Sequence, residues 1–370
     1  MTEPRPVPFQ RPTFPAADRI EHYFERSRDR RWFSNRGPCL ELLTERLGAR
    51  TGAVCLPVAS GTLGLLVAVA GVRRAGTTAL VPSFTFPATA QALIWNDLQP
   101  VFVDIDAEHW HLSPRALEQA LAEGGDDVAL VVACSAFGTP PPPAVREAWA
   151  DACRAAGVPL LVDSAAGFGA IAEDGVPIGA QGTAEVVSFH ATKPLAIGEG
   201  GAIFSRDDAL VARMARLANF GFDANRHPIE RRGINAKLDE LHAATALAAL
   251  DDLDAQLTAR HVRACRMREG LGAQLVPQLG HEHSTVQFVS LLARDRAARN
   301  RMFERADGRI EIRSYYEPLH RAPAFADLPR VADLAVTDDI GGRIVSLPMA
   351  VDLTDSEIAE IVDVVAGDAR

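Results

Sequence analysis

The sequence contains few cysteines, and those it has are scattered. They are Cys39, Cys55, Cys134, Cys153 and Cys265, and no two of them form a Cys-x-x-Cys pair. This spacing argues against a disulfide-stapled fold and against a cysteine-rich zinc site. We therefore expect reduced, mostly buried thiols in a cytoplasmic protein.

An excess of positive charge and a long apolar run are also missing. The formal net charge is -10, so the surface repels phosphate backbones and nucleic acid is not expected as a partner. No apolar segment approaches the roughly 20 residues of a membrane-spanning helix, so no membrane association is expected. The N-terminal MTEPRPVPFQRPTFPAADR has no apolar core of the kind found in signal peptides. With 48% apolar and 23% charged residues, the composition is that of a globular protein.

Apolar segments typical of strands alternate with helical segments along the first half of the chain, as in PVFVDID, VALVVAC and PLLVD. Such alternation predicts right-handed crossovers and a largely parallel α/β sheet. The unbroken apolar runs fit strands that are covered on both faces. The pattern changes after Asp207. We predict a large α/β domain with an N-terminal arm over residues 1–250 and a smaller C-terminal α+β domain over residues 251–370.

The segment EVVSFHATKPLAIGEGGAIFS contains two strand-like pieces around a turn-rich centre with Lys193. Burial disfavours an ammonium group and lowers the pKa of a lysine, which makes its neutral amine available as a nucleophile. The glycines after Lys193 let the backbone pass close to a ligand. Taken alone, Lys193 is better explained as a surface lysine in a hairpin loop.

Three further features favour a ligand site. Ser60, Gly61 and Thr62 follow a predicted strand and begin an apolar helix, where free N–H groups and the helix dipole attract phosphate. Asp163 ends the strand PLLVD, where a carboxylate is suited to pair with the pyridine nitrogen of pyridoxal phosphate (PLP). Phe86 follows another strand and is suited to stack on a flat ring. Each has an ordinary alternative: a plain helix cap for the first two features and a core residue for Phe86.

The order and spacing of these features resemble the DegT/DnrJ/EryC1/StrS family of fold-type I PLP enzymes, known mainly as sugar aminotransferases. The resemblance covers almost the whole chain. It rests on RWFSNRGP, VASGTLGLL, VPSFTFPATAQALIWNDLQPVFVDID, LVDSAAGFGA, SFHATKPLAIGEGGAIFSRD, GINAKLDELHAATALAAL, RSYYEPLH and LPMAVDLTDSEIAEIV.

The resemblance implies a role for each matching residue. Lys193 resembles the lysine that carries PLP as a Schiff base, Asp163 resembles the partner of the pyridine nitrogen, and Phe86 matches the stacking aromatic. The expected phosphate contacts are Ser60, Gly61, Thr62 and Ser188. Asn235 resembles an asparagine that reaches the phosphate of a neighbouring subunit, which implies a homodimer with shared active sites.

The sequence departs from the family pattern at two positions. The family often has a histidine or glutamine three residues after the aspartate, near the cofactor hydroxyl, and here Ala166 stands there. The family often has an aromatic after the glycine at 233, and here Ile234 follows it, while a basic residue is kept as Lys237. These changes affect the expected substrate more than the expected cofactor.

Other side chains are weaker candidates for substrate binding. His190 lies close to Lys193 in the sequence, although a structural histidine is equally consistent with its position. Tyr315, Tyr316 and His320 in RSYYEPLH are candidates for the pocket by their position in the family, and Arg313 is a candidate for binding an anion there. His281 and His283 flank a glutamate without a third ligand nearby, so no metal site is expected.

The favoured hypothesis is an aminotransferase with two half-reactions. An amino-acid donor, with glutamate as the first candidate, converts PLP to pyridoxamine phosphate, and a ketone acceptor takes the amine while Lys193 moves the proton. The resemblance implies a keto-sugar or related acceptor in nucleotide-sugar or antibiotic biosynthesis. One alternative is a PLP lyase or dehydratase, although dehydratases of this group are expected to carry histidine in place of Lys193. Another alternative is a non-catalytic PLP-binding regulatory protein.

Overall fold

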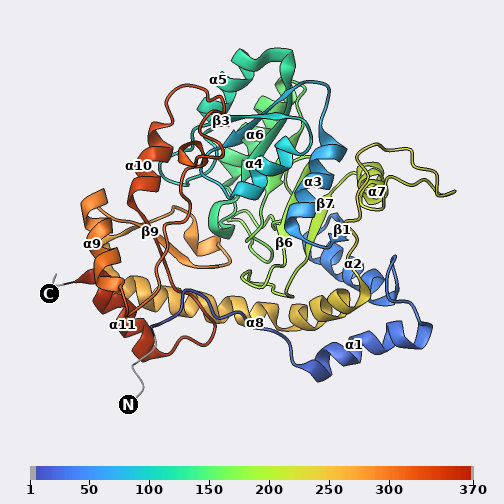
Figure 1. The fold of residues 1–370 in the computed structure, drawn as a ribbon. Helices are drawn as coiled ribbons and strands as arrows, with labels where there is room; N and C mark the ends of the chain where they lie inside the picture. Colours follow the sequence, from blue (N-terminus) through green and yellow to red (C-terminus); the bar gives the residue numbers. More distant parts are fainter. Residues whose placement is uncertain (1–5, 368–370) are drawn as a thin grey trace.

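The computed structural model describes residues 6–367 and is built around a seven-stranded sheet (Figure 1). The strand order is β1–β7–β6–β5–β4–β2–β3. The strands are β1 (Val54–Val58), β2 (Thr78–Pro82), β3 (Gln99–Val103), β4 (Val128–Cys134), β5 (Leu160–Asp163), β6 (Ala184–Ser188) and β7 (Gly201–Ser205). Strands β2 to β6 pair in parallel, and β7 is antiparallel to both of its neighbours. The predicted α/β fold with a mostly parallel sheet is confirmed.

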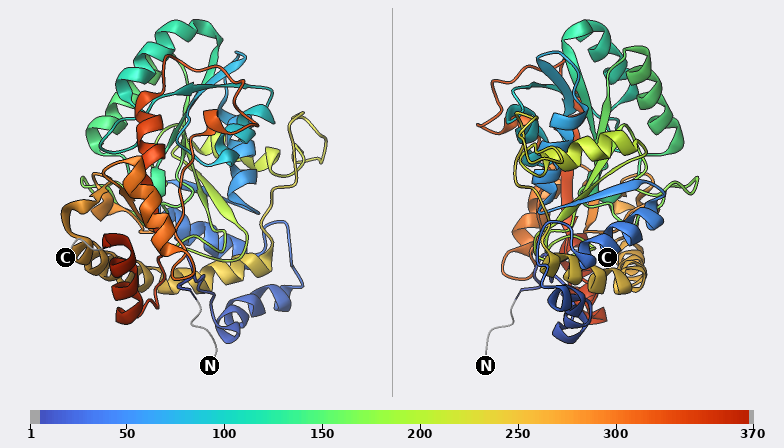
Figure 2. Two further views of the ribbon diagram at one scale, coloured as in Figure 1. Left: turned by 60° about the vertical axis from the view of Figure 1, so that its left-hand side comes forward. Right: turned by 90° about the vertical axis from the view of Figure 1, so that its right-hand side faces the viewer.

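Helices cover both faces of this sheet (Figure 2). They are α1 (Ala17–Arg30), α2 (Pro38–Thr51), α3 (Gly61–Val72), α4 (Pro87–Ile94), α5 (Pro114–Gly124), α6 (Pro143–Ala155), α7 (Asp208–Leu217), α8 (Glu240–Leu271), α9 (Arg296–Ala306), α10 (Ala335–Arg343) and α11 (Asp355–Ala366). Residues of α3, α4 and α7 form one apolar core with the sheet, and α5 and α6 form another. Because the strands are buried on both faces, they carry the unbroken apolar runs seen in the sequence.

The long helix α8 connects this body to the C-terminal part. Its first half packs with α2 against the sheet, and its second half joins a separate core with α9 and α11. The strands β8 (Val276–Pro277), β9 (Val289–Leu292) and β10 (Ile344–Leu347) form a small antiparallel sheet there. The division proposed at residue 250 lies within α8, and residues 1–5 and 368–370 of the proposed domains lie outside the described residues.

The N-terminal segment packs against the end of the chain. Val7 forms a backbone bridge with Ile310, and Gln10 forms one with Met349. Val7 also belongs to the C-terminal apolar core. The segment before α1 is therefore part of the same packing unit as β10 and its surroundings.

One strand is shorter in the structure than the sequence pattern indicates. The run STVQFVSLL has the apolar character of a single strand, but only Val289–Leu292 pairs as β9. Val286 has a left-handed backbone, with φ of 52°, which interrupts an extended run.

Among the described residues, Cys39, Cys55, Cys134 and Cys153 are buried free thiols, and Cys265 is exposed. None of the helices described here has both the length and the apolar character needed to cross a bilayer.

Candidate active site

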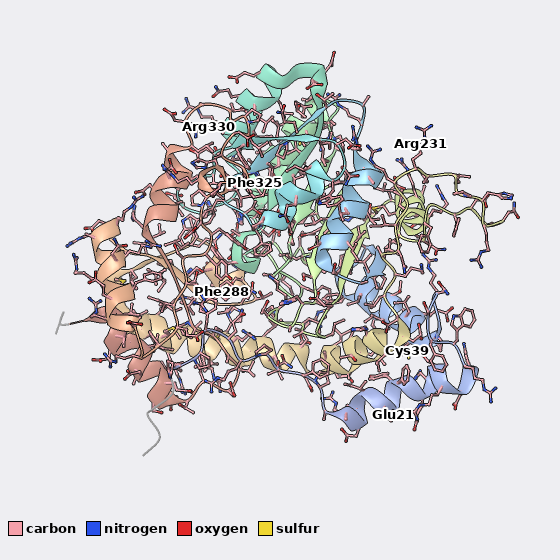
Figure 3. The ribbon with its side chains drawn as sticks, in the orientation of Figure 1. Glu21, Cys39, Arg231, Phe288, Phe325 and Arg330 are labelled. Carbon is pink, nitrogen blue, oxygen red and sulfur yellow. The ribbon has the colours of Figure 1, made fainter. Side chains whose placement is uncertain are left out.

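A cavity of about 360 Å³ lies at the carboxyl ends of the central strands. Residues that follow β1, β4, β5 and β6 line it, together with residues from the C-terminal part such as Phe288, which is labelled in Figure 3. Ligands of α/β sheets bind at this end of the strands. The volume lies within the range of small-molecule sites.

Lys193 lies in the connection between the antiparallel strands β6 and β7 and lines the cavity. Burial lowers the pKa of its amine to about 8, although the charges of Asp163 and Cys134 act in the opposite direction. The Nζ donates a hydrogen bond of 3.4 Å to Oε1 of Gln287. Lys193 and Lys237 are the only lysines in the sequence, and Lys193 alone borders this cavity. The connection is a hairpin loop, but the lysine points inward rather than to the surface.

Asp163, the last residue of β5, is 3% exposed and borders the same cavity. Burial raises the pKa of its carboxyl, while hydrogen bonds and the charge of Lys193 oppose the rise. Thr89 donates to Oδ2 at 2.7 Å, and the N–H of Ala165 donates to Oδ1 at 3.1 Å. Thr85 lies 2.8 Å from the hydroxyl of Thr89. The carboxylate is thereby held in one orientation.

The beginning of α3 borders the cavity and is suited to hold a phosphate group. Ser60 caps the helix by accepting a hydrogen bond from the N–H of Leu63 at 3.1 Å. The N–H groups of Gly61 and Thr62 in the first turn have no partner within the helix, so they are available to an anion. A Cβ added at Gly61 would lie 2.7 Å from the Cβ of Ser188. Glycine at this position therefore lets α3 begin directly beside Ser188. Ser60, Gly61, Thr62 and Ser188 all line the cavity, and their N–H and hydroxyl groups fit a phosphate-bearing cofactor.

The structure brings the predicted aromatic and histidine side chains to the same cavity. Phe86, His190, Tyr315 and Tyr316 all line it. The ring of Phe86 is 52% exposed, which leaves its face free for a planar ligand. Tyr316 stacks on Phe137 with ring centres 4.9 Å apart, and burial raises the pKa of its phenol well above the usual value.

Three predicted residues lie outside the cavity. His320 bridges Ser83 and Asp338 through its two ring nitrogens, at 2.7 Å and 3.0 Å, and therefore joins two segments of the fold. Arg313 lies over the ring of Phe9 and contacts Glu311, and it is not among the residues that line the cavity. Asn235 is exposed and accepts a hydrogen bond of 2.6 Å from Lys237.

Sequence reasoning missed several polar residues of the cavity. They are Gln10, Thr85, Ser135, Thr192, Glu199 and Gln287, and Thr89 behind Asp163 was missed as well. Thr85 and Thr89 belong to the segment that had already suggested Phe86. Gln10 and Gln287 are far from every recognised motif and are brought in only by tertiary packing.

Comparisons with known proteins agree with this fold and site. The model of the DegT/DnrJ/EryC1/StrS aminotransferase family matches residues 16–366. Protein Rv3402c of Mycobacterium tuberculosis (strain ATCC 25618 / H37Rv) is 36% identical, over 96% of this chain and 88% of its own length. A putative PLP-dependent aminotransferase from Bacillus cereus ATCC 10987 superposes with a TM-score of 0.89 and 30% identity, over 98% of this chain and all of that one. DesI, crystallised in the presence of its TDP-sugar product, gives a TM-score of 0.87 and 30% identity, over 98% and 93% of the two chains.

Fold, site and comparisons together define a PLP-dependent aminotransferase. The chain belongs to the DegT/DnrJ/EryC1/StrS aminotransferase family. This confirms the resemblance seen in the sequence and favours amino transfer over the lyase and the regulatory protein that were weighed beside it.

Proposed function

We propose that this enzyme moves an amino group from an amino acid, with glutamate as the first candidate, to a ketone on a nucleotide-linked sugar. The observation that carries the proposal is the position of Lys193. Its amine has a pKa lowered to about 8 and borders the same cavity as the carboxylate of Asp163 and the beginning of α3. These groups match the three things that PLP requires of a protein: an amine, an anchor for the ring nitrogen and a phosphate cradle. When bound, PLP accepts the negative charge that develops on the reacting carbon.

Lys193 is assigned to proton transfer. An amine with a pKa near 8 is neutral in a substantial fraction of molecules close to neutral pH, so it can accept a proton and later return it. Asp163 is assigned to the protonated pyridine nitrogen, because an ionised carboxylate favours the positive charge there. Thr89 is a positioning residue that donates to this carboxylate at 2.7 Å.

Ser60, Gly61, Thr62 and Ser188 are assigned to the phosphate. The N–H groups of the first helical turn and the nearby hydroxyls supply donors, and the helix dipole favours negative charge at this end. Phe86 is assigned to the ring face. PLP and pyridoxamine phosphate share the phosphate and the ring, so the same residues hold both forms of the cofactor.

The polar lining of the cavity supports a sugar acceptor. Gln10 and Gln287 present side-chain amides, and Tyr315 and Tyr316 present phenols, which suit the hydroxyl groups of a sugar. DesI, a structural relative, was crystallised with a TDP-sugar product. We therefore assign the acceptor to the nucleotide-linked keto-sugars, with His190 beside them and the reaction in the cytoplasm.

We also propose a homodimer in which Asn235 serves the partner's site. Asn235 follows a segment that projects from the body of the molecule, where Arg231 is labelled (Figure 3). Exposed apolar side chains stand on this segment and near the entrance of the cavity, namely Phe220, Ile229 and Phe86. A second copy covering these side chains would bury them and bring Asn235 to the neighbouring phosphate cradle.

Absorbance spectroscopy tests the proposal. Purified enzyme with PLP should show the band of the lysine-bound cofactor, and glutamate should convert it to the amino form with release of the keto acid. Lys193→Ala should abolish turnover, whereas Lys237→Arg, the matched change at the other lysine, should keep the band. A band that survives in Lys193→Ala but disappears in Lys237→Arg would refute the assignment.

A further inference from the structure

A chain of hydrogen bonds leads from the cavity to a buried carboxyl group. The hydroxyl of Ser135, which lines the cavity, lies 2.8 Å from the hydroxyl of Ser164. Ser164 in turn donates to Oε1 of Glu185. Their exposed fractions are 3% for Ser135 and 0% for Ser164 and Glu185. We call these three residues the serine chain.

The two oxygens of Glu185 have different partners. Oε2 accepts hydrogen bonds from the N–H groups of Gly179 at 2.6 Å and Gln181 at 3.0 Å. A backbone N–H group can only donate a hydrogen bond, so Oε2 must remain an acceptor. A proton on the carboxyl therefore resides on Oε1, the oxygen that contacts Ser164. The charge state of Glu185 is therefore transmitted only through Ser164.

The surroundings of Glu185 carry no compensating positive charge among the described residues. Its neighbours are Val162 of β5, Ser164 directly after β5 and Phe204 of β7, and the loop before β6 contributes backbone N–H groups. Asp163, the ionisable residue of β5, directs its oxygens to Thr89 and Ala165 instead. Burial raises the pKa of the Glu185 carboxyl to about 7, and the hydrogen bonds from Ser164, Gly179 and Gln181 oppose the rise. Both charge states are therefore accessible near neutral pH.

The charge state fixes the direction of every hydrogen bond in the serine chain. When Glu185 is ionised, Ser164 donates to it and accepts from Ser135, so Ser135 offers only a lone pair to the cavity. When Glu185 is neutral, its proton is donated to Ser164, and Ser164 donates to Ser135. The hydrogen of Ser135 is then free to point into the cavity.

We propose that Ser135 contacts the phenolic oxygen of PLP, where Ala166 offers no polar side chain, and that Glu185 orients the hydrogen of Ser135 through Ser164. This inference rests on the proposed function. Ser135 is held beside the anchor of the ring nitrogen, because its N–H donates to the carbonyl of Asp163 at 2.9 Å. Ala166 borders the same cavity and is 4% exposed. The phenolic oxygen of bound PLP is anionic and prefers a donor, so it favours the neutral state of Glu185.

A pH titration of the absorption band of bound PLP tests the contact. The lysine-bound cofactor loses a proton as the pH rises, and a donor to the phenolic oxygen stabilises the deprotonated form and lowers the midpoint. Ser135→Ala should therefore raise the midpoint by about one pH unit, as expected for the loss of a hydrogen bond to a charged group. Ser135→Cys keeps a weak donor and should give a smaller rise, and it serves as the test if the alanine variant does not fold.

Glu185→Gln tests the orientation. The amide oxygen can still accept from Gly179 and Gln181, and the amide N–H₂ can only donate to Ser164, so the serine chain is locked in the direction of the neutral acid. The wild-type titration should show an additional inflection near the pKa of Glu185, and the variant should lose it. Ser164→Ala, which breaks the chain, should lose it as well.

The outcomes separate this inference from the proposed function. Absence of a lysine-bound band in the wild type would overturn the proposed function. A normal band with the same midpoint in Ser135→Ala and in the wild type would overturn the contact alone. Retention of the inflection in Glu185→Gln would overturn the role of Glu185.

Discussion

The amine of Lys193 is predicted to titrate near pH 8 in the cofactor-free enzyme. Burial lowers its pKa from 10.5 to about 8. At pH 7.5, a group with this pKa is neutral in about one molecule in four, compared with about one in a thousand for an ordinary lysine. The structure therefore predicts about 200 times more nucleophilic amine at this position than at an exposed lysine.

Because the sequence contains only two lysines, the reaction of Lys193 with PLP can be measured without interference from other lysines. In a Lys237→Arg background, Lys193 is the sole lysine of the chain. Cofactor-free protein is mixed with PLP at a series of pH values and reduced with borohydride after a short fixed time, and the modified Lys193 peptide is quantified by mass spectrometry. Because only the peptide that contains Lys193 is quantified, PLP attached to the N-terminal amine does not contribute to the signal. The initial rate should rise with pH and level off above about pH 8.

Asp163→Asn tests whether the charge of Asp163 raises or lowers the pKa of Lys193. The charge of Asp163 raises the pKa of Lys193, so its removal should move the midpoint of the labelling curve below that of the parent. A parent midpoint near 10.5 would show that the amine is not held in a desolvated site. A midpoint that moves upward in Asp163→Asn would contradict the proximity of the two charges.

Three other perturbations follow from the site and its support. Thr89→Val removes a donor from Asp163, and the dissociation constant for PLP, measured by equilibrium dialysis, should rise about tenfold because a hydrogen bond to a carboxylate contributes about 1.5 kcal/mol or more. Gly61→Ala places a methyl group against Ser188 and should weaken PLP binding, and adding Ser188→Gly should restore part of it. Glu240→Gln weakens a buried carboxylate that accepts from three N–H groups at the beginning of α2 and should lower the Tm by several degrees in calorimetry.

Each of these has a matched control. Thr85→Val acts one hydrogen bond further from Asp163 and should have a smaller effect than the change at Thr89. Glu41→Gln changes an exposed carboxylate in the first turn of α2 and should lower the Tm far less than Glu240→Gln. Equal losses from both threonine variants, or no gain from the Ser188→Gly addition, would show that the contacts described do not determine cofactor binding.

The parallel part of the fold could be predicted from the sequence because its signals are local. VALVVAC and PLLVD are continuous apolar runs of strand length, and they form β4 and β5. The direction of β7 could not be predicted in the same way. Strand-like flanks around Lys193 do not reveal whether the chain crosses over or turns back, because that depends on packing of the connection. The same limit applies to STVQF, which does not join β9 and whose Gln287 and Phe288 line the cavity.

The candidate site could be predicted where one residue marks the end of an element, as Asp163 and Ser60 do. It could not be predicted where the residue has no local pattern. Ser135 and Gln287 are ordinary polar residues in the sequence, and their place beside Lys193 depends on the relative position of distant segments. His320 shows the opposite case, because its position in a recognisable motif suggested the pocket, whereas Ser83 and Asp338 hold it elsewhere.

The bridge between Gln10 and Met349 has a consequence for biosynthesis. Gln10 borders the cavity and donates to the carbonyl of Thr192, which precedes Lys193. One wall of the pocket is thus made by a segment that pairs with a residue more than 300 positions further along the chain. A nascent chain can fold its central sheet during translation, but it cannot finish this wall until Met349 has been synthesised.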